Sequence, residues 1–426
     1  MKWKSVELGN ITKRIRNGLN IRQRPDAGGW PITRIETISD QVINCNHLGY
    51  AGIKEGRYED WYLEPGEIIF SHINSEERIG NCAIYEGVPY PLIHGMNLLC
   101  FSPNENLVIP KFLLYMVRSN QFRLNLKPII KRAVNQASVS IGDLVKIKLP
   151  LPPISEQRRI VEILDQADRL RKLRANADAK AARILPALFY KMFGDPISNP
   201  LRLPTESVGN LLTLFRNGTT AAQNQEGRGY PVTRIETISE GLINPERVHY
   251  VEINDEEIDK WLLEPGDILF SHINSESHIG KTAIYKGKPS PLIHGMNLLL
   301  MRPDTTKVLP EYLFALLNTD SVRTAYRQRC KRAVNQASLN QQDISVLKVG
   351  IALKHFQKRF CQLANGLLMQ IQTQKKVLRN FESLFNNLLH YAFNGDLTAK
   401  WREMHMKALV EEIEAQVRAL NMRVNP

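Results

Sequence analysis

Apolar positions in the last quarter of the chain recur every three or four residues. The stripe consists of Phe356, Phe360, Leu363, Leu367, Ile371, Leu378, Phe381, Phe385, Leu388 and Ala392, with the polar Gln374 at its middle. Such spacing is typical of a helix in a coiled-coil seam, where a polar layer fixes the register of the two helices. The pattern predicts a long helix within 351–398, and about 40 residues of helix span roughly 60 Å.

A second, less regular stripe runs from about Ser155 to Phe193 and predicts a central helix within 151–196. Pro186 lies inside it and should kink the helix. Its polar middle, with Arg171, Arg174 and Asp178, is expected to face Gln374 if the two long helices pair antiparallel. The alternative is that each helix packs only on its own domain.

After Asp396 the tail again has helical spacing, which predicts an amphipathic helix within 399–426 that docks on the coil or on a partner protein. The apolar positions are Met406, Leu409, Val410, Ile413, Val417, Leu420 and Val424.

The two remaining segments, 1–150 and 197–350, alternate short β-type runs, turn signals and short helical stretches. Glu67–Phe70 and Asp267–Phe270 each follow a Glu-Pro-Gly turn, which favours a strand. Pro110–Arg118 and Pro310–Leu317 have the pattern of helices. Each segment is therefore predicted to be a compact α+β domain.

The chain repeats itself at an offset of 200 residues. Trp61–Cys100 and Trp261–Leu300 are identical at 29 of 40 positions, and KRAVNQAS occurs at Lys131–Ser138 and at Lys331–Ser338. We therefore expect an α+β fold of two repeated globular domains, joined by two long helices that form an antiparallel coiled coil with pseudo-two-fold symmetry. Duplex DNA is a large ligand whose backbone has the same symmetry.

Composition adds a preference for a polyanionic partner. The formal net charge is +13 and the pI is about 9.4, which favours nucleic acid without proving it. No apolar run approaches the roughly 20 residues of a membrane span, and the N-terminus lacks the apolar core of a signal peptide, so we expect a cytoplasmic protein. None of the five cysteines has a cysteine at its repeat position, which argues against an inherited metal or disulfide framework.

The stretch from Asn135 onward, NQASVSIGDLVKIKLPLPPISEQRRIVEIL, carries a resemblance to a known family. Pro152 and Pro153 stop a helix from extending backwards, Ser155 can cap the next one, and Glu156 sits at its positive end. This junction resembles the DNA-specificity subunit of type I restriction-modification enzymes. The second repeat departs from the pattern, since only Gln357 of the Glu-Gln pair survives there.

The resemblance implies a non-catalytic subunit with two target-recognition domains, each followed by a spacer helix. Such a subunit recognises two short half-sites in double-stranded DNA and holds two modification subunits, which methylate adenine, and two restriction subunits, which drive cleavage. It implies no cofactor in this chain, with S-adenosylmethionine, ATP and Mg on the partner subunits.

The repeated KRAVNQAS mixes cations, which neutralise phosphates, with amides, which can pair with adenine. The alternative is a solvated loop with a helix cap. The predicted DNA contacts are Lys131, Arg132, Asn135, Gln136 and Ser138, with Lys331, Arg332, Asn335, Gln336 and Ser338.

Polar residues at strand ends are a second candidate set, since they can reach a groove of the duplex. The alternative for the arginines is a buried pair with Glu36 or Glu236 inside each domain. The candidates are Arg34, Ser71, His72 and Asn74, with Arg234, Ser271, His272 and Asn274.

Two rival functions stay open on the sequence alone. His72, Glu76 and His94 have side chains that suit a metal-dependent nuclease, although their spacing offers no clear helical ligand pair. A stand-alone DNA-binding regulator is the other rival, and co-purification with a methyltransferase would separate it from a specificity subunit.

Overall fold

The computed structural model of the chain describes residues 3–24, 27–133, 136–181, 183–238, 241–275, 278–333 and 336–424. For residues 255, 332–333, 336, 368–369, 371–376, 378–379 and 421–424 it describes the backbone. The chain divides into two compact units. Unit 1 comprises Met1–Arg174 and Leu378–Pro426, and unit 2 comprises Ala175–Val377.

Unit 1 contains the first α+β domain, built on an antiparallel sheet of four strands in the order β2-β6-β3-β5. Helix α1 packs beside the sheet, and Pro110 opens it at the position where a missing N–H costs nothing. The elements are β1 (Lys4–Glu7), β2 (Thr12–Asn17), β3 (Ile68–Ser71), β4 (Ile73–Asn74), β5 (Cys82–Ile84), β6 (Leu98–Pro103), α1 (Pro110–Arg118), α2 (Asn120–Leu126), β7 (Lys131–Ala133), β8 (Gln136–Ser138), α3 (Ile141–Leu144) and β9 (Lys148–Leu151).

Unit 2 repeats this plan with the sheet order β11-β18-β15-β17 and adds a small sheet, β12-β14-β13. The elements are α5 (Ile184–Phe193), β10 (Thr205–Ser207), β11 (Leu212–Asn217), β12 (Gln223–Asn224), β13 (Tyr230–Val232), β14 (His249–Val251), α6 (Asp255–Ile258), β15 (Ile268–Ser271), β16 (Ile273–Asn274), β17 (Thr282–Ile284), β18 (Leu298–Pro303), α7 (Pro310–Leu317), α8 (Asp320–Arg329), β19 (Lys331–Ala333), β20 (Gln336–Ser338), α9 (Gln341–Ser345) and β21 (Lys348–Gly350). The predicted helices Pro110–Arg118 and Pro310–Leu317 are confirmed.

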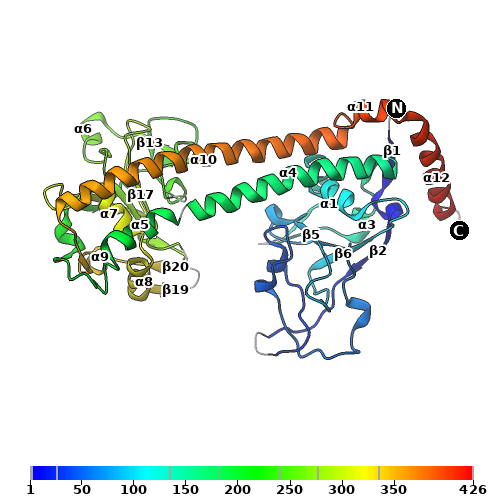
Figure 1. Ribbon diagram of the computed structural model, residues 1–426, viewed down its shortest axis with the longest axis horizontal. Coiled ribbons are helices and arrows are strands. Elements are labelled where there is room, and N and C mark those ends of the chain that lie inside the picture. Colours follow the sequence, from blue (N-terminus) through cyan, green and yellow to red (C-terminus); the bar gives the residue numbers. More distant parts are fainter. Residues whose placement is uncertain are drawn as a thin grey trace. The chain divides into compact units, whose positions relative to one another are not determined.

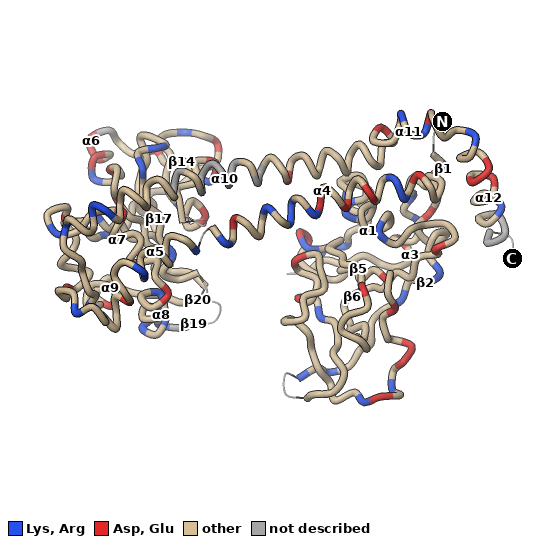
Figure 2. Tube along the Cα trace, viewed as in Figure 1, with Lys and Arg blue, Asp and Glu red and all other residues tan. Residues whose placement is uncertain are grey.

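The two long helices are α4 (Ile154–Ala181) and α10 (Lys354–Asn394), as predicted. The central helical stretch is interrupted rather than kinked at Pro186, because α4 ends at Ala181 and α5 begins at Ile184, which places Pro186 in the first turn of α5. Charged residues are distributed along α4, in keeping with its irregular stripe (Figure 2).

In each unit the two helices run in opposite directions. In unit 1 the start of α4, with Ile160 and Leu164, shares a buried cluster with Phe385 and Phe393 near the end of α10. In unit 2 the ring of Phe189 in α5 lies 5.6 Å from that of Phe360 near the start of α10. Each long helix therefore does more than pack on the domain that precedes it, and the predicted fold class is confirmed. The side chain of Gln374, predicted to form the polar layer, lies outside the described part.

A glutamine joins each domain to its long helix in the same way in both units. The Gln157 side chain donates to the carbonyl oxygens of Leu107 and Pro152 at 2.9 Å each and accepts from the Ile109 N–H at 2.8 Å. Gln357 makes the equivalent three bonds. Both side chains are fully buried, and each pairs with three backbone groups. In unit 1 Gln416 of the tail donates to the same two carbonyl oxygens, at 3.4 and 3.2 Å.

The tail forms α11 (Ala399–Met404) and α12 (Met406–Val424), and it docks on the start of α4 within unit 1 (Figure 1). Glu412 accepts from the Ser155 N–H at 3.0 Å. The prediction that Ser155 caps the helix was wrong, because α4 begins one residue earlier and Ser155 lies in its first turn. Its N–H is one of the donors that every helix start leaves free, and here the tail satisfies it.

Glu156 is the centre of this contact. It is fully buried and accepts from Trp3 Nε1 at 2.9 Å, from Thr398 Oγ1 at 2.6 Å and from Arg402 Nε at 2.8 Å. The Arg402 guanidinium also lies 4.9 Å from the centre of the Trp3 ring. One carboxylate thus ties together Trp3 near the N-terminus, the start of α4 and the tail.

Candidate nucleic-acid interface

The repeated KRAVNQAS folds into two strands of a small three-stranded sheet. In unit 1 the order is β4-β8-β7, with Lys131 opposite Ser138 and Ile73 also opposite Ser138. In unit 2 β16-β20-β19 has the same register. The fold therefore brings the two predicted sets together, because β4 and β16 carry Asn74 and Asn274 of the strand-end set.

The cations of the first hairpin point to solvent, but they are not without partners. The side chains of Lys131 and Arg132 are 72% and 69% exposed. Arg132 forms a two-pronged ion pair with Glu76, with N–O distances of 2.7 and 2.6 Å, which lowers the pKa of Glu76. Lys131 lies 4.0 Å from Asp143. A phosphate that binds Arg132 must therefore compete with Glu76.

Several predicted contacts in the hairpins cannot be placed. Asn135 and Asn335 lie outside the described residues, and so do the side chains of Arg332 and Gln336. Gln136 is exposed on β8, Ser138 and Ser338 are half-buried, and Lys331 is exposed.

The residues at the end of β3 and β15 hold the backbone rather than face solvent. Ser71 is 1% exposed, and its Oγ accepts from Asn74 Nδ2 at 3.1 Å. Asn74 Oδ1 accepts in turn from the Ser75 N–H at 2.8 Å. Ser271 and Asn274 repeat both bonds. Each serine hydroxyl is thus buried and accepts a structural bond, while each asparagine keeps one N–H free of these bonds.

His72 and His272 follow these serines, and burial lowers the pKa of both imidazoles, that of His72 to about 4. His72 is 8% exposed and therefore uncharged near neutral pH. A neutral, largely buried imidazole contributes little to phosphate binding, which removes the electrostatic part of its predicted role.

Arg34 and Arg234 each lie beside an acidic residue, but the pairs are exposed rather than buried as the alternative interpretation required. Arg34 Nε is 3.5 Å from Glu36, and Arg234 Nε is 3.2 Å from Glu236. The arginine side chains are 48% and 40% exposed. Both guanidinium groups are accessible to a ligand.

In unit 2 two hollows that share Ile235 and Glu236 join these residues into one surface. The first, of about 360 Å³, is lined by Ser271, Asn274, Ser275, His278 and Lys281. The second, of about 270 Å³, is lined by Arg234, Gln223, Met296 and Asn297. Gln223, Lys281 and Asn297 were absent from the predicted contacts, since the segments that carry them meet only in the fold.

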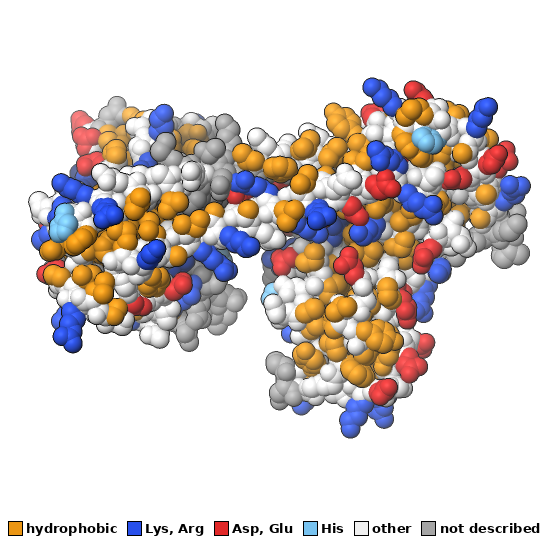
Figure 3. Space-filling model, viewed as in Figure 1, with side chains coloured by type: hydrophobic (Ala, Val, Ile, Leu, Met, Phe, Trp, Pro, Cys, Tyr) orange, Lys and Arg blue, Asp and Glu red, His pale blue; other side chains and the backbone are white. Residues whose placement is uncertain are grey.

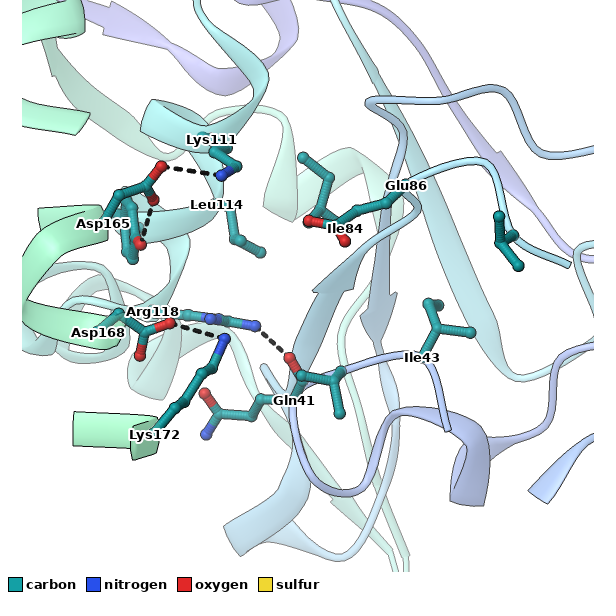
Figure 4. A pocket seen from close by; sticks show the side chains of 13 residues that line it. Gln41, Ile43, Ile84, Glu86, Lys111, Leu114, Arg118, Asp165, Asp168 and Lys172 are labelled. Carbon is teal, nitrogen blue, oxygen red and sulfur yellow. Dashed lines mark hydrogen bonds and ion pairs between the residues drawn. The ribbon is translucent and has the colours of Figure 1, made fainter. Parts of the chain in front are cut away.

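A separate hollow of about 210 Å³ in unit 1 lies between the domain and α4 (Figure 4). Four of its charged side chains pair with one another: Lys111 with Asp165 and Lys172 with Asp168, each at 2.8 Å. Glu86 also lines this hollow. The seam anchors the domain to its helix.

The corresponding seam in unit 2 carries the opposite charge at one repeat position. Lys286, the repeat position of Glu86, donates to Glu311 at 2.6 Å and to Asn365 at 3.3 Å. The difference between Glu86 and Lys286 therefore belongs to the attachment of the domains to their helices.

His94 and His294 are fully buried at the tight turn that precedes β6 or β18, and each imidazole Nε2 lies 3.1 Å from a backbone oxygen, that of Leu98 or Leu298. Burial lowers their pKa values to about 3 and about 4. Asn97 and Asn297 adopt positive φ in the same turns. The two histidines are structural, and each helps to shape the turn that carries its asparagine.

Acidification should therefore destabilise the protein. As the pH falls from 7 to 5, both histidines become protonated in the unfolded chain, where their pKa is near 6.5, but they stay neutral in the folded chain. The unfolded state then binds more protons than the folded state, so the free energy of unfolding falls. We expect about 2 kcal/mol per histidine at pH 5. Urea unfolding at the two pH values measures the loss. His94→Gln and His294→Gln, which keep an N–H donor, should reduce it, and an equal loss in these variants would contradict the assignment.

The residues that the structure describes contain no group of three or more His, Cys, Asp or Glu side chains that could hold a metal ion. Both oxygens of Glu76, the carboxylate of the nuclease hypothesis, are bound to Arg132. In the same described part no helix is long and apolar enough to cross a membrane, and all five cysteines are free thiols.

Comparison with known proteins agrees with this architecture. Residues 1–181 match the model of the type I restriction modification DNA specificity domain. A putative type I restriction enzyme MjaX specificity subunit of Methanocaldococcus jannaschii is 50% identical over 169 residues, which are 39% of this chain and 40% of that protein. The EcoKI specificity subunit of Escherichia coli K12 is 26% identical over 424 residues, covering 91% of this chain and 88% of that protein.

Among solved structures, the S subunit of a type I restriction-modification system from M. genitalium has the same fold, with a TM-score of 0.50 at 13% identity, over 92% of this chain and 96% of that one. The repeated domains, the long helices and these relatives point the same way: residues 1–181 match a type I restriction modification DNA specificity domain, and the chain is similar over about nine tenths of its length to a type I restriction enzyme specificity subunit.

Proposed function

We propose that this subunit reads a two-part target in double-stranded DNA, one half-site with each domain, and that the two half-sites form an interrupted near-palindrome. The observation that carries the proposal is the repetition of one arrangement in both units. The same residues stand in the same register in β4-β8-β7 and in β16-β20-β19. Like side chains on like backbones read like bases.

The orientation of the half-sites follows from the helices. Because α4 with α5 and α10 run in opposite directions within each unit, the second domain is proposed to read its half-site on the opposite strand. The half-sites should lie about one helical turn apart, roughly 10 bp from centre to centre, so that both domains reach the same side of the duplex.

The helices are also proposed to hold the modification subunits. Leu170 and Leu173 on α4 are each 55% exposed, and Phe356 and Leu363 on α10 are 47% and 49% exposed. Figure 3 shows hydrophobic side chains at the surface along these helices. Half-exposed leucine and phenylalanine side chains on each helix favour a protein partner.

The repeat makes this argument more specific at Phe356. Its repeat position is Glu156, which the tail covers completely in unit 1. In unit 2 the described residues leave Phe356 half-exposed. A helix of a modification subunit is proposed to cover this surface. The complex is proposed to contain two modification subunits and two restriction subunits. S-adenosylmethionine, ATP and Mg are proposed to bind to those subunits.

Methylation mapping in cells that carry the complete system tests the proposal. Methylated adenines should define two related half-sites in inverted orientation. Two unrelated half-sites, or a direct repeat, would contradict the near-palindrome. The purified chain, incubated alone with S-adenosylmethionine and DNA, should transfer no methyl group, and transfer by the chain alone would overturn its assignment as a recognition subunit.

A further inference from the structure

Arg34 and Arg234 occupy the same repeat position, but their surroundings differ. Two residues before each arginine the backbone pairs with a neighbouring segment. In the first domain Ile32 is opposite Gly49, and in the second Val232 is opposite His249, which is the repeat position of Gly49. Each guanidinium lies beside the glutamate two residues later. The residue that faces the arginine from the neighbouring segment is Gly49 in the first domain and His249 in the second.

In the second domain His249 holds Arg234. Arg234 Nη1 lies 2.9 Å from His249 Nδ1, and His249 Nε2 lies 3.2 Å from the side-chain amide of Gln225. A guanidinium only donates hydrogen bonds, so the neutral imidazole accepts from Arg234 at Nδ1 and carries its hydrogen at Nε2. The contact of Nε2 with the Gln225 amide nitrogen then joins two donors and adds no hydrogen bond. Arg234 is thus fixed by two acceptors, His249 and Glu236. Gln225, Glu236 and His249 also line a common hollow of about 480 Å³.

In the first domain position 49 carries no side chain, and Gln23 fills the place of the imidazole. A Cβ on Gly49 would lie 1.8 Å from Gln23 Oε1 and 3.0 Å from Arg34 Cδ, so the space belongs to Gln23 and Arg34 themselves. Among the described residues, the Arg34 guanidinium lies within ion-pair distance of Glu36 alone, at 3.5 Å. Both of its terminal nitrogens are therefore available to another acceptor.

This difference matters because arginine selects guanine through two parallel N–H bonds to O6 and N7. The Arg34 guanidinium can turn towards DNA if its one exposed ion pair, with Glu36, lengthens. Arg234 must break its bond to His249 as well, and a bond from a charged donor is among the stronger ones in a protein. The two arginines therefore differ in readiness for bidentate contact, although their sequence neighbourhoods, TRIETIS, are identical.

We infer that His249 is a specificity-determining residue: it restrains Arg234, so the first domain selects guanine at one position where the second domain does not. The target then departs from two-fold symmetry at this base pair. His249 acts through Arg234 and needs no contact with DNA of its own. The inference rests on the proposed function, since it concerns the bases that the two domains read.

The test uses the full chain assembled with its modification subunits and a panel of duplexes with each base of each half-site replaced in turn. Competition binding gives the preference for each base. Arg34→Ala should lose a guanine preference at one position of the first half-site, by roughly tenfold or more. His249→Ala should create a similar preference at the equivalent position of the second half-site, and His249→Ala with Arg234→Ala should abolish it.

His249→Asn is the matched control, because its side-chain oxygen can accept from Arg234 as Nδ1 does, and it should keep the wild-type preference. Unchanged discrimination of the first half-site shows that each His249 variant is folded. If His249→Ala leaves the second half-site unchanged while Arg34→Ala still loses its preference, the inference is wrong and the proposed function stands. If neither Arg34→Ala nor Arg234→Ala changes any base preference, these arginines do not read DNA, and that part of the proposed function fails too.

Discussion

Replacing Glu156 with alanine should cost unit 1 about 3–5 kcal/mol of folding free energy, because removal of one partner of a buried ion pair leaves the other charge uncompensated. Arg402, 12% exposed, would keep its bond to the Gly395 oxygen, a longer bond of 3.4 Å to Thr398 Oγ1 and its position over Trp3, but no carboxylate. Trp3 Nε1 and Thr398 Oγ1 would lose their acceptor as well. Denaturant unfolding followed by hydrogen exchange, peptide by peptide, measures the loss in each unit.

The repeat supplies the control for this experiment. Phe356, at the position equivalent to Glu156, is 47% exposed, so Phe356→Ala should change the stability of unit 2 by less than about 1 kcal/mol. The same variant should weaken assembly with a modification subunit if that subunit covers Phe356. In unit 1, adding Arg402→Met to Glu156→Ala should recover part of the loss, since an apolar replacement removes the orphaned charge. A Glu156→Ala protein as stable as the wild type would show that the tail is not held by this carboxylate.

The sequence predicted the elements well where periodicity and end signals agreed. Pro110 and Pro310 mark helix starts, and the apolar stripe from Phe356 onward predicted a helix that the structure shows over Lys354–Asn394. The role of Gln157 and Gln357 could not be predicted, although Gln357 is the one residue of the Glu-Gln pair that the second repeat keeps. Two of the three partners of each glutamine are backbone groups about 50 residues earlier, which no local pattern identifies.

The contacts of the candidate site were harder to predict than its residues. The hairpin sequence pointed to Lys131 and Arg132, but the pairing of Arg132 with Glu76 joins residues 56 apart through two strands. Similarly, the buried Glu156 has partners that are 153 and 246 residues away. His249 drew no attention because its repeat position is a glycine, and only the register of β13 with β14 brings it to Arg234. Sequence identity between the repeats could therefore suggest two domains of equal specificity, but not the hydrogen bond that makes them unequal.

Removing the four hairpin cations Lys131, Arg132, Lys331 and Arg332 together should weaken binding to all DNA sequences, by roughly 10²–10⁴ at 0.1 M salt if each neutralises a phosphate. The slope of the logarithm of the binding constant against the logarithm of the salt concentration should become less steep by about 0.9 for each phosphate that the variant no longer neutralises. Gln136→Ala and Asn135→Ala should act differently: they should relax discrimination at one half-site by about 1–3 kcal/mol and leave the slope unchanged. Titrations of specific and random duplexes at several salt concentrations separate the two effects.

Glu76→Gln makes this prediction sharper, because Glu76 holds Arg132 with two bonds of 2.6 and 2.7 Å. If Glu76 competes with phosphate, its neutral amide should release Arg132 and remove a negative charge from the hairpin. Binding should then strengthen for every sequence and the salt slope should steepen, whereas Arg132→Ala combined with Glu76→Ala should stay close to the wild type. Weaker binding by Glu76→Gln would contradict the competition. If neither the cation variants nor the amide variants change binding, the hairpin is a structural element and the bases are read from the hollows around Glu236 and from their counterpart in the first domain.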